Sequence, residues 1–245
     1  MAAAFGLAPP PEPARIFRAE RRVRLADVTP AGRLRLDAVA RYLQDVATDD
    51  VTETGVPGPW VLRRQALEIE REPRYNELVT LATWCSGIGS RWAERRTTVS
   101  GANGAAIESV ALWVLVDAAS GRPARLEPTF FTHYELAASG RTVRARLEHP
   151  DPPPNPVARQ FTVRATDLDV LDHVNNAVFW VPVEEELARA RSGIRPVRAE
   201  LEYRGALELE SDVNVVVEDN GESDPLALWL CVGSEVRASA RVWTR

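Results

Sequence analysis

A proline-rich segment near the middle of the chain is the feature that most restricts its fold. Five of the nine residues from Glu148 to Pro156 are proline. Because proline lacks a backbone donor and fixes its own φ angle, neither a helix nor an inner strand can pass through this segment. We therefore predict a semi-rigid linker over residues 148–157 that separates two domains, residues 16–147 and residues 158–245. Residues 1–15 are rich in alanine and proline without periodicity, and we expect a disordered tail there.

The two domains repeat the same order of sequence signals. Each has a short strand, a loop, an amphipathic helix and then several alternating strands. When Asp167 is placed on Asp27, an offset of 140 residues, Arg164 falls on Arg24 without a gap. This register indicates an internal duplication at the scale of a domain.

Apolar residues recur at helical spacing early in each domain. In the second domain this spacing predicts a helix from Val174 to Leu187, which Pro182 should kink or interrupt. In the first domain it predicts a helix with one buried stripe formed by Leu36, Val39, Ala40, Leu43, Val46 and Ala47.

Alternating segments after each helix predict antiparallel strands. They cover residues 66–70, 79–85, 92–100 and 107–117 in the first domain and 197–204, 212–218, 226–232 and 236–243 in the second. A long helix wrapped by later antiparallel strands is the hot-dog arrangement. We therefore predict an α+β fold of two tandem hot-dog domains whose helices pack together across a continuous sheet.

Composition argues against several functional classes. The formal net charge of -5 is opposite to the basic excess of a general nucleic-acid binder. No stretch approaches the roughly 18 consecutive apolar residues of a membrane span, and no signal-peptide pattern opens the chain, so we expect a cytoplasmic protein. Cys85 and Cys231 are the only cysteines. They form neither a disulfide framework nor a metal cluster, and we expect no metal and no cofactor.

All basic residues other than histidine are arginine. The pairs Arg63–Arg64 and Arg95–Arg96 either form a docking surface for an acidic partner or are ordinary solvated charges. The sequence leaves both interpretations open.

The segment from Thr166 to Asn176 carries the most chemical information. Asp169 and His173 lie four residues apart just before a helix, where backbone amides have no intrahelical partner. Such amides can polarise a carbonyl, and a nearby Asp or His can orient or deprotonate a water. The same residue types also form ordinary helix caps and turns, which is our main interpretation of Asn175 and Asn176.

This segment resembles the D-L-D-x-N-x-H-V-N-N signature of the acyl-acyl carrier protein thioesterases of plants and bacteria. Further segments stand in that family's order, namely residues 60–64, 67–70, 83–84, 95–96 and 111–115. The resemblance implies a tandem hot-dog hydrolase of fatty acid biosynthesis that acts on a fatty acyl thioester of acyl carrier protein, an acidic partner. It also implies that the acyl pocket is formed mainly by the first domain and that Asp169 and His173 match the family's catalytic Asp and His.

Two positions depart from the family pattern. Leu171 stands where the family has a catalytic Asn, and Ala206 stands where it has a catalytic Glu. Neither side chain can form a hydrogen bond. The remaining D-x-x-x-H spacing also resembles the single-domain acyl-CoA thioesterases, in which an Asp equivalent to Asp169 does the chemistry. We therefore expect Asp169 to act as general base or nucleophile and His173 to position substrate or water.

We expect supporting roles for several other residues. Glu202 or Glu208, which alternate with position 206 on one strand face, could replace the missing Glu, although a solvent-facing salt bridge is the more usual role for such residues. We expect Asn175, Trp60 and Trp113 to contact substrate, and Trp84 and Trp92 are further candidates for the acyl channel, although most tryptophans belong to the core.

Three alternative functions are consistent with a hot-dog fold. One is an acyl-CoA thioesterase, and another is a non-catalytic acyl-binding protein that has lost the catalytic Asn and Glu. A hot-dog dehydratase is disfavoured because the loop from Asp27 to Arg33 carries no histidine. We expect either a monomer, in which the two domains pair as a pseudo-dimer, or a homodimer.

Overall fold

The computed structural model of the chain describes residue 12, residues 14–154, residue 156 and residues 158–245. Most of the tail expected over residues 1–15 therefore lies outside the described residues. Its last residue, Arg15, is held in place, because its Nε donates to Asp50 Oδ1 at 2.7 Å.

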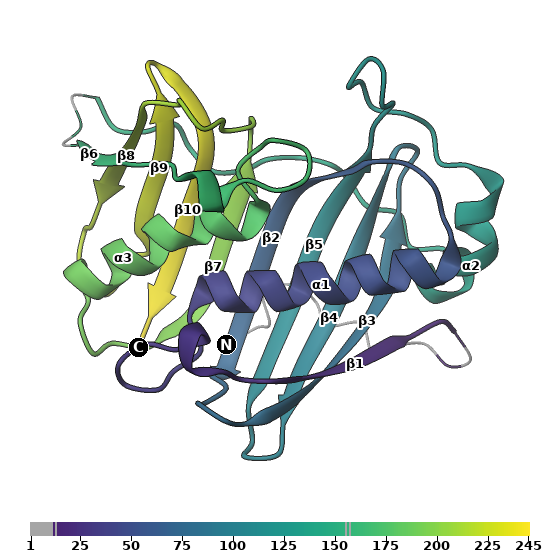
Figure 1. The fold of residues 1–245 in the computed structure, drawn as a ribbon, viewed down its shortest axis with the longest axis horizontal. Helices are drawn as coiled ribbons and strands as arrows, with labels where there is room; N and C mark the ends of the chain where they lie inside the picture. The colour runs from purple at the N-terminus through teal and green to yellow at the C-terminus, as the bar shows by residue number, and fades with distance from the viewer. Residues whose placement is uncertain (1–11, 13, 155, 157) are drawn as a thin grey trace.

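One continuous antiparallel sheet runs through both halves of the described chain (Figure 1). The strand order is β1-β3-β4-β5-β2-β7-β10-β9-β8-β6. β2 pairs with β7 at the centre, where Leu67 lies opposite Ala199. The two halves have the same strand order when each is read from its outer edge to the centre: β1-β3-β4-β5-β2 in the first half corresponds to β6-β8-β9-β10-β7 in the second. The strands are β1 (Phe17–Arg22), β2 (Trp60–Arg71), β3 (Leu78–Ile88), β4 (Trp92–Gly101), β5 (Ala106–Leu115), β6 (Ala158–Phe161), β7 (Pro196–Tyr203), β8 (Val213–Glu218), β9 (Leu226–Val232) and β10 (Glu235–Thr244).

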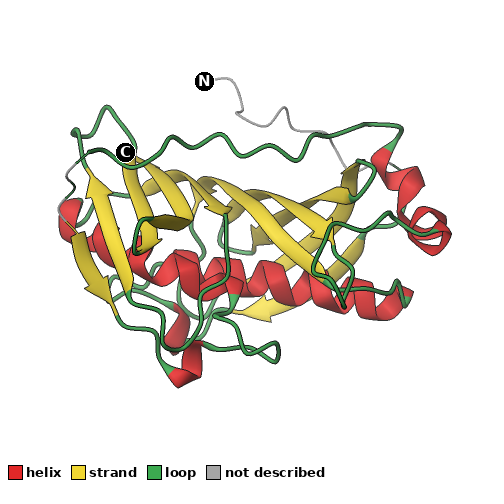
Figure 2. Cartoon of the chain, turned by 90° about the horizontal axis from the view of Figure 1, so that it is seen from above, coloured by secondary structure: helices red, strands yellow, loops and turns green. Residues whose placement is uncertain are grey.

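Two helices lie on one face of this sheet, α1 (Leu36–Thr54) against the first half and α3 (Trp180–Ala190) against the second (Figure 1). They contact each other across the middle of the molecule, and the sheet curves over them (Figure 2). All six positions of the stripe predicted for the first helix are buried. The predicted double hot-dog fold is therefore confirmed. Within the described residues, no helix combines the length and apolarity needed to cross a membrane.

The second helix differs from its prediction. Val174 forms an isolated bridge with Leu168, residues 176–179 form a 3-10 helix, and the α-helix begins only at Trp180. Pro182 therefore lies in the first turn of α3, where a missing backbone donor costs little. The interruption falls before the proline rather than at it, because the 3-10 segment replaces the expected first turns.

The loops that lead into the two helices have the same hydrogen bonds. The amide of Arg24 donates to Asp27 Oδ2 at 3.0 Å, and the amide of Arg164 donates to Asp167 Oδ2 at 2.9 Å. Each aspartate ends a short 3-10 helix. The 140-residue offset found in the sequence is therefore a structural repeat.

The linker crosses the outer face of the sheet (Figure 2). The indole of Trp229 donates to the carbonyl of Pro150 at 2.8 Å. The His149 ring is buried, with Nδ1 3.1 Å from Ser239 Oγ and Nε2 3.2 Å from Glu200 Oε2. These contacts hold the linker against the second half.

Replacing Glu200 by glutamine is expected to lower stability in a pH-dependent way. Burial raises the pKa of Glu200, but hydrogen bonds from His149 and Arg198 outweigh it and lower the pKa from 4.5 to about 2. Because the folded pKa lies below the unfolded one, the carboxylate stabilises the fold fully above about pH 4.5 and loses this contribution as pH falls towards 2. Urea unfolding of wild type and Glu200→Gln from pH 7 to pH 2 should give converging stabilities. A constant difference would contradict the assignment.

A buried ion pair joins the two halves. The Arg33 guanidinium, from the loop before α1, contacts Glu184 of α3, and the two side chains are 14% and 10% exposed. We expect Arg33→Leu to lower the free energy of unfolding by about 3 kcal/mol, because it leaves a buried carboxylate without its cation. Chemical denaturation measures this change. The double variant Arg33→Leu/Glu184→Leu should recover much of this loss of stability. If the double variant lost more stability than the two single variants together, the ion pair would not stabilise the fold as expected.

Candidate active site

A cavity of about 290 Å³ lies between α1, the first half of the sheet and the loop before the second helical segment. Its walls come mainly from the first half. The second half contributes Asp169, Leu171 and Asn176. The first half contributes Gln44, Ala47, Thr48, Val51, Thr52, Val56, Trp60, Cys85, Ala93, Glu94, Arg95, Trp113, Phe130 and Tyr134.

The cavity follows α1 from Gln44 towards Val56. At 1.5 Å per residue this corresponds to roughly 15 Å of helix, enough for an extended aliphatic chain. The end that contains Leu171 reaches the surface, because this side chain is 65% exposed. We call this end the mouth.

Aromatic side chains line the walls of the cavity. Trp60 packs on Phe130, with ring centroids 5.6 Å apart. The indole N–H groups of Trp60 and Trp113 are buried, and no described residue accepts a hydrogen bond from either. Both tryptophans expected to contact substrate therefore line the cavity. Trp84 is buried elsewhere in the sheet, and Trp92 donates instead to the carbonyl of Val143 at 2.9 Å.

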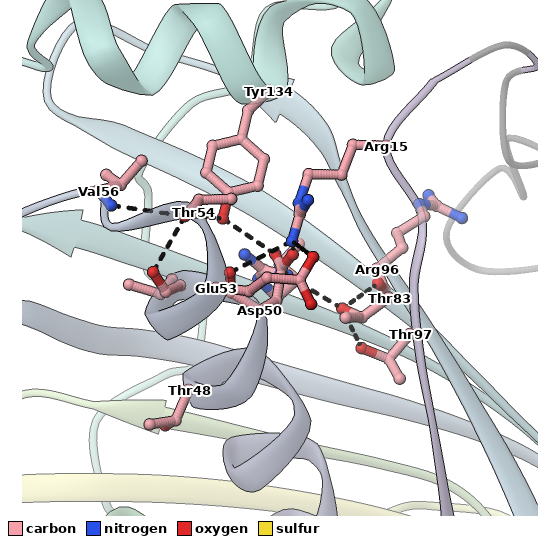
Figure 3. Close-up of polar contacts among 12 residues, drawn as sticks. Arg15, Thr48, Asp50, Glu53, Thr54, Val56, Thr83, Arg96, Thr97 and Tyr134 are labelled. Carbon is pink, nitrogen blue, oxygen red and sulfur yellow. Dashed lines mark hydrogen bonds and ion pairs between the residues drawn. The ribbon is translucent and has the colours of Figure 1, made fainter.

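A buried polar network around Asp50 includes Arg95 and Tyr134, which both line the cavity (Figure 3). The Asp50 side chain is 1% exposed and accepts hydrogen bonds from Arg15 and Arg95, both at 2.7 Å, and from the Tyr134 hydroxyl at 3.0 Å. Arg96, next to Arg95, is also buried. The Arg95–Arg96 pair is therefore part of the interior, and a docking role for it is excluded.

A tight loop positions Asp169 at the mouth. Its backbone N–H donates to the carbonyl of His173 at 2.9 Å, and its Oδ1 accepts from the Leu171 N–H at 2.9 Å. Asp172 has a φ of 60°, the left-handed conformation that Gly32 adopts at the equivalent position of the first half. Among the described residues, none forms a hydrogen bond with the Asp169 Oδ2 atom. That oxygen is available to a substrate or a water.

The other predicted residues of this loop lie differently. His173 is exposed and does not line the cavity. Asn175 Oδ1 accepts from the Ala177 N–H at 2.9 Å and so caps the 3-10 helix, while the next residue, Asn176, lines the cavity. The structure thus brings Asp169 together with Trp60 and Trp113, but it leaves His173 and Asn175 outside the lining.

The suggested replacements for the missing Glu are wrong. Glu202 is fully buried on the outer face, where it accepts from the linker amides of Glu148 at 2.6 Å and His149 at 3.1 Å. Glu208 is exposed in the loop after β7. Alternation along a strand does not continue to Glu208, because β7 ends at Tyr203.

Most of the lining was not predicted from the sequence, including Phe130, Tyr134 and Gln44. Phe130 and Tyr134 come from α2 (Pro128–Ala138), a helix that was not predicted. Pro128 at its first position was an available signal for a helix start. Gln44 was not predicted as a site residue, and its Oε1 atom is buried without a hydrogen-bond partner in the described part of the chain.

Cys85 also lines the cavity. Burial raises the pKa of its thiol to about 11. The thiol is therefore protonated at neutral pH, which makes it a poor nucleophile.

Two family models match the chain. The acyl-ACP thioesterase N-terminal domain matches residues 14–134, and the acyl-ACP thioesterase C-terminal domain matches residues 152–241. An uncharacterised protein of Mycobacterium tuberculosis is 27% identical over 222 residues, which cover 89% of this chain and 88% of that protein. The chloroplastic palmitoyl-acyl carrier protein thioesterase of Gossypium hirsutum is 23% identical over 172 residues, 60% of this chain and 41% of the plant protein.

Solved structures share the fold. The 12:0-ACP thioesterase of Umbellularia californica superimposes with a TM-score of 0.79 at 21% identity, over 94% of this chain and 97% of that chain. An acyl-ACP thioesterase of Bacteroides thetaiotaomicron gives a TM-score of 0.80 at 18% identity, over 94% and 98%. Together with the matched domains, the family and the fold support thioester hydrolysis. The chain belongs to the acyl-ACP thioesterase family.

Proposed function

We propose that this protein hydrolyses the thioester of a fatty acyl chain carried on acyl carrier protein. The observation that carries the proposal is the position of Asp169, whose carboxylate lies at the mouth of a long, mostly apolar cavity. Membership of the acyl-ACP thioesterase family supports the carrier, as does the plant relative named for a palmitoyl-acyl carrier protein substrate.

The geometry suggests how the reaction proceeds. The acyl tail lies along α1, and the thioester carbonyl reaches the mouth near the Asn176 N–H, which has no acceptor among the described residues. This amide donates to the carbonyl oxygen, where negative charge develops. Asp169 takes a proton from a water, whose oxygen attacks the carbonyl carbon. The carbon–sulfur bond of the tetrahedral intermediate then breaks. The carrier thiol leaves with the proton that Asp169 took up, and the free fatty acid is formed.

His173 has a different position in this scheme. Because its ring is exposed beside the mouth, it can only contact the part of the substrate that extends beyond the cavity. We propose that it positions this part of the thioester. The two fused halves already provide the contact between α1 and α3, and we propose that the protein acts as a monomer.

The direct test is thiol release from acyl carrier protein thioesters of graded chain length, beside CoA thioesters of the same acyl groups. A kcat/KM at least about tenfold higher for the carrier protein thioesters is expected, since one such factor corresponds to only about 1.4 kcal/mol of additional contact. Equal or higher values with CoA would reassign the carrier.

A single turnover in ¹⁸O-labelled water tests the role of Asp169. If the carboxylate acts as a base, the first fatty acid formed carries the label. If it acts as a nucleophile, that product takes an unlabelled oxygen from Asp169.

One observation favours a second candidate, a non-catalytic acyl-binding protein. Leu171 and Ala206 remove two hydrogen-bonding groups that the resemblance associates with catalysis. Tight binding of an acyl thioester without any thiol release would support this candidate and overturn hydrolysis.

A further inference from the structure

The structural repeat relates the cavity to a second location in the molecule. With the offset of 140 residues, Gln44 of α1 corresponds to Glu184 of α3, and Leu36 corresponds to Asn176. In the first half, Glu184 reaches from α3 to the start of α1. There its Oε2 accepts a hydrogen bond from the Leu36 N–H at 3.0 Å, and its carboxylate pairs with Arg33. A backbone amide at this position thus holds a carboxylate oxygen.

The equivalent groups in the cavity are unpaired. Gln44 and Asn176 both line it. Among the described residues, none forms a hydrogen bond with the buried Gln44 Oε1 atom and none accepts from the Asn176 N–H. An unpaired buried polar group costs about 1–3 kcal/mol, so such groups in a cavity indicate a ligand that satisfies them. The place occupied by a carboxylate oxygen in one half is therefore free in the other.

We propose that the side-chain amide of Gln44 donates a hydrogen bond to the thioester carbonyl oxygen, together with the Asn176 N–H. The inference rests on the proposed function. It adds a substrate-contacting residue from the first half to a site whose carboxylate, Asp169, comes from the second half. The Oε1 atom has almost no accessible surface, so the donor that can reach a ligand is Nε2 of the same amide, which forms no hydrogen bond with a described residue. Two donors then hold the oxygen as it becomes negative in the tetrahedral intermediate.

Gln44→Leu removes the donor with little change in side-chain size. We expect kcat to fall by about 100-fold, the usual effect of losing one oxyanion donor, and KM to change less than about threefold. Gln44→Glu should be at least as slow as Gln44→Leu at neutral pH. Its loss of kcat relative to wild type should grow as pH rises, because an ionised carboxylate repels the oxyanion. A group that only positioned water through its oxygen would instead tolerate Gln44→Glu.

Glu184→Gln is the matched control. It alters the repeat-equivalent residue, which packs at the far side of the two-helix interface and does not line the cavity. We expect it to lower the melting temperature while kcat stays within twofold of wild type. If Glu184→Gln and Gln44→Leu reduced kcat equally, the effect would be structural and the proposal would be overturned.

A second readout does not depend on turnover. The probe is an acyl-CoA analogue with a methylene inserted between sulfur and a ¹³C-labelled carbonyl, and its carbonyl stretching frequency is measured when bound. Wild type should lower this frequency, and Gln44→Leu should lose about half of that shift.

If wild type failed to hydrolyse any thioester but Gln44→Leu still altered the carbonyl band, the proposed function would fall and the contact would stand. If wild type hydrolysed thioesters but Gln44→Leu changed neither kcat nor the band, the contact would fall and the proposed function would stand. If wild type neither hydrolysed a thioester nor shifted the carbonyl band, the proposed function and the contact would both be overturned.

Discussion

Replacing Asp169 with asparagine is expected to lower kcat for acyl carrier protein thioesters by about 1000-fold, within the range for loss of a general base. Asparagine has nearly the same shape, and its amide oxygen can still accept the hydrogen bond that Oδ1 accepts from the Leu171 N–H. The loop should therefore keep its conformation while the site loses its proton acceptor. The measurement is thiol release at saturating substrate, with thermal unfolding to show that the fold is unchanged.

Asp172→Asn is the control for this variant. It makes the same chemical change three residues away in the same loop, at an exposed position whose φ of 60° asparagine tolerates. We expect its kcat to stay within about twofold, because surface substitutions away from functional groups have small effects. Retention of more than a tenth of wild-type kcat by Asp169→Asn would show that this carboxylate is not the base.

Enlarging a side chain deep in the cavity is expected to shorten the accepted acyl chain. Val51 lies on α1 about two turns beyond Gln44 and lines the cavity. A tryptophan there displaces the end of a long tail. If about four methylenes lose their contacts at about 0.8 kcal/mol each, kcat/KM for the longest wild-type substrate falls by about 200-fold. Chains about four carbons shorter should change less than about threefold.

Leu136→Trp tests whether an added tryptophan has a general effect. Leu136 is an apolar residue on the surface of α2, 65% exposed and outside the cavity lining. Its substitution should leave the chain-length profile of kcat/KM as it is in wild type. An equal loss for long and short substrates in Val51→Trp would mean that the tail does not follow α1.

Periodic patterns predicted most of the fold because they record burial directly. The stripe on α1 and the alternation in β7 are local consequences of one face meeting the core, so they can be read without knowing what the core contains. The start of α3 was misplaced because a 3-10 turn and an α-turn share the same apolar spacing over four residues. The helix α2 was missed because it is short and its apolar residues do not form a clear stripe.

The candidate site was only partly predictable for a related reason. The hydrogen bonds of Asp169 itself all lie within four residues along the chain, so a local motif was enough to find it. Gln44 has no such signal, because its position at the cavity depends on how α1 packs against the other half of the chain. Glu202 shows the opposite error. The alternation in β7 predicted correctly which face of the sheet it lies on, but not that the linker covers this face.

The ion pair between Arg33 and Glu184 has a consequence for stoichiometry. Duplication gave the polypeptide two copies of one scaffold, but in the first copy a salt bridge fills the position that corresponds to the reactive end of the cavity. On the proposed function, the first copy holds the two halves together and the second carries out hydrolysis. Each polypeptide should accordingly handle a single acyl group at a time, delivered from one end of the molecule.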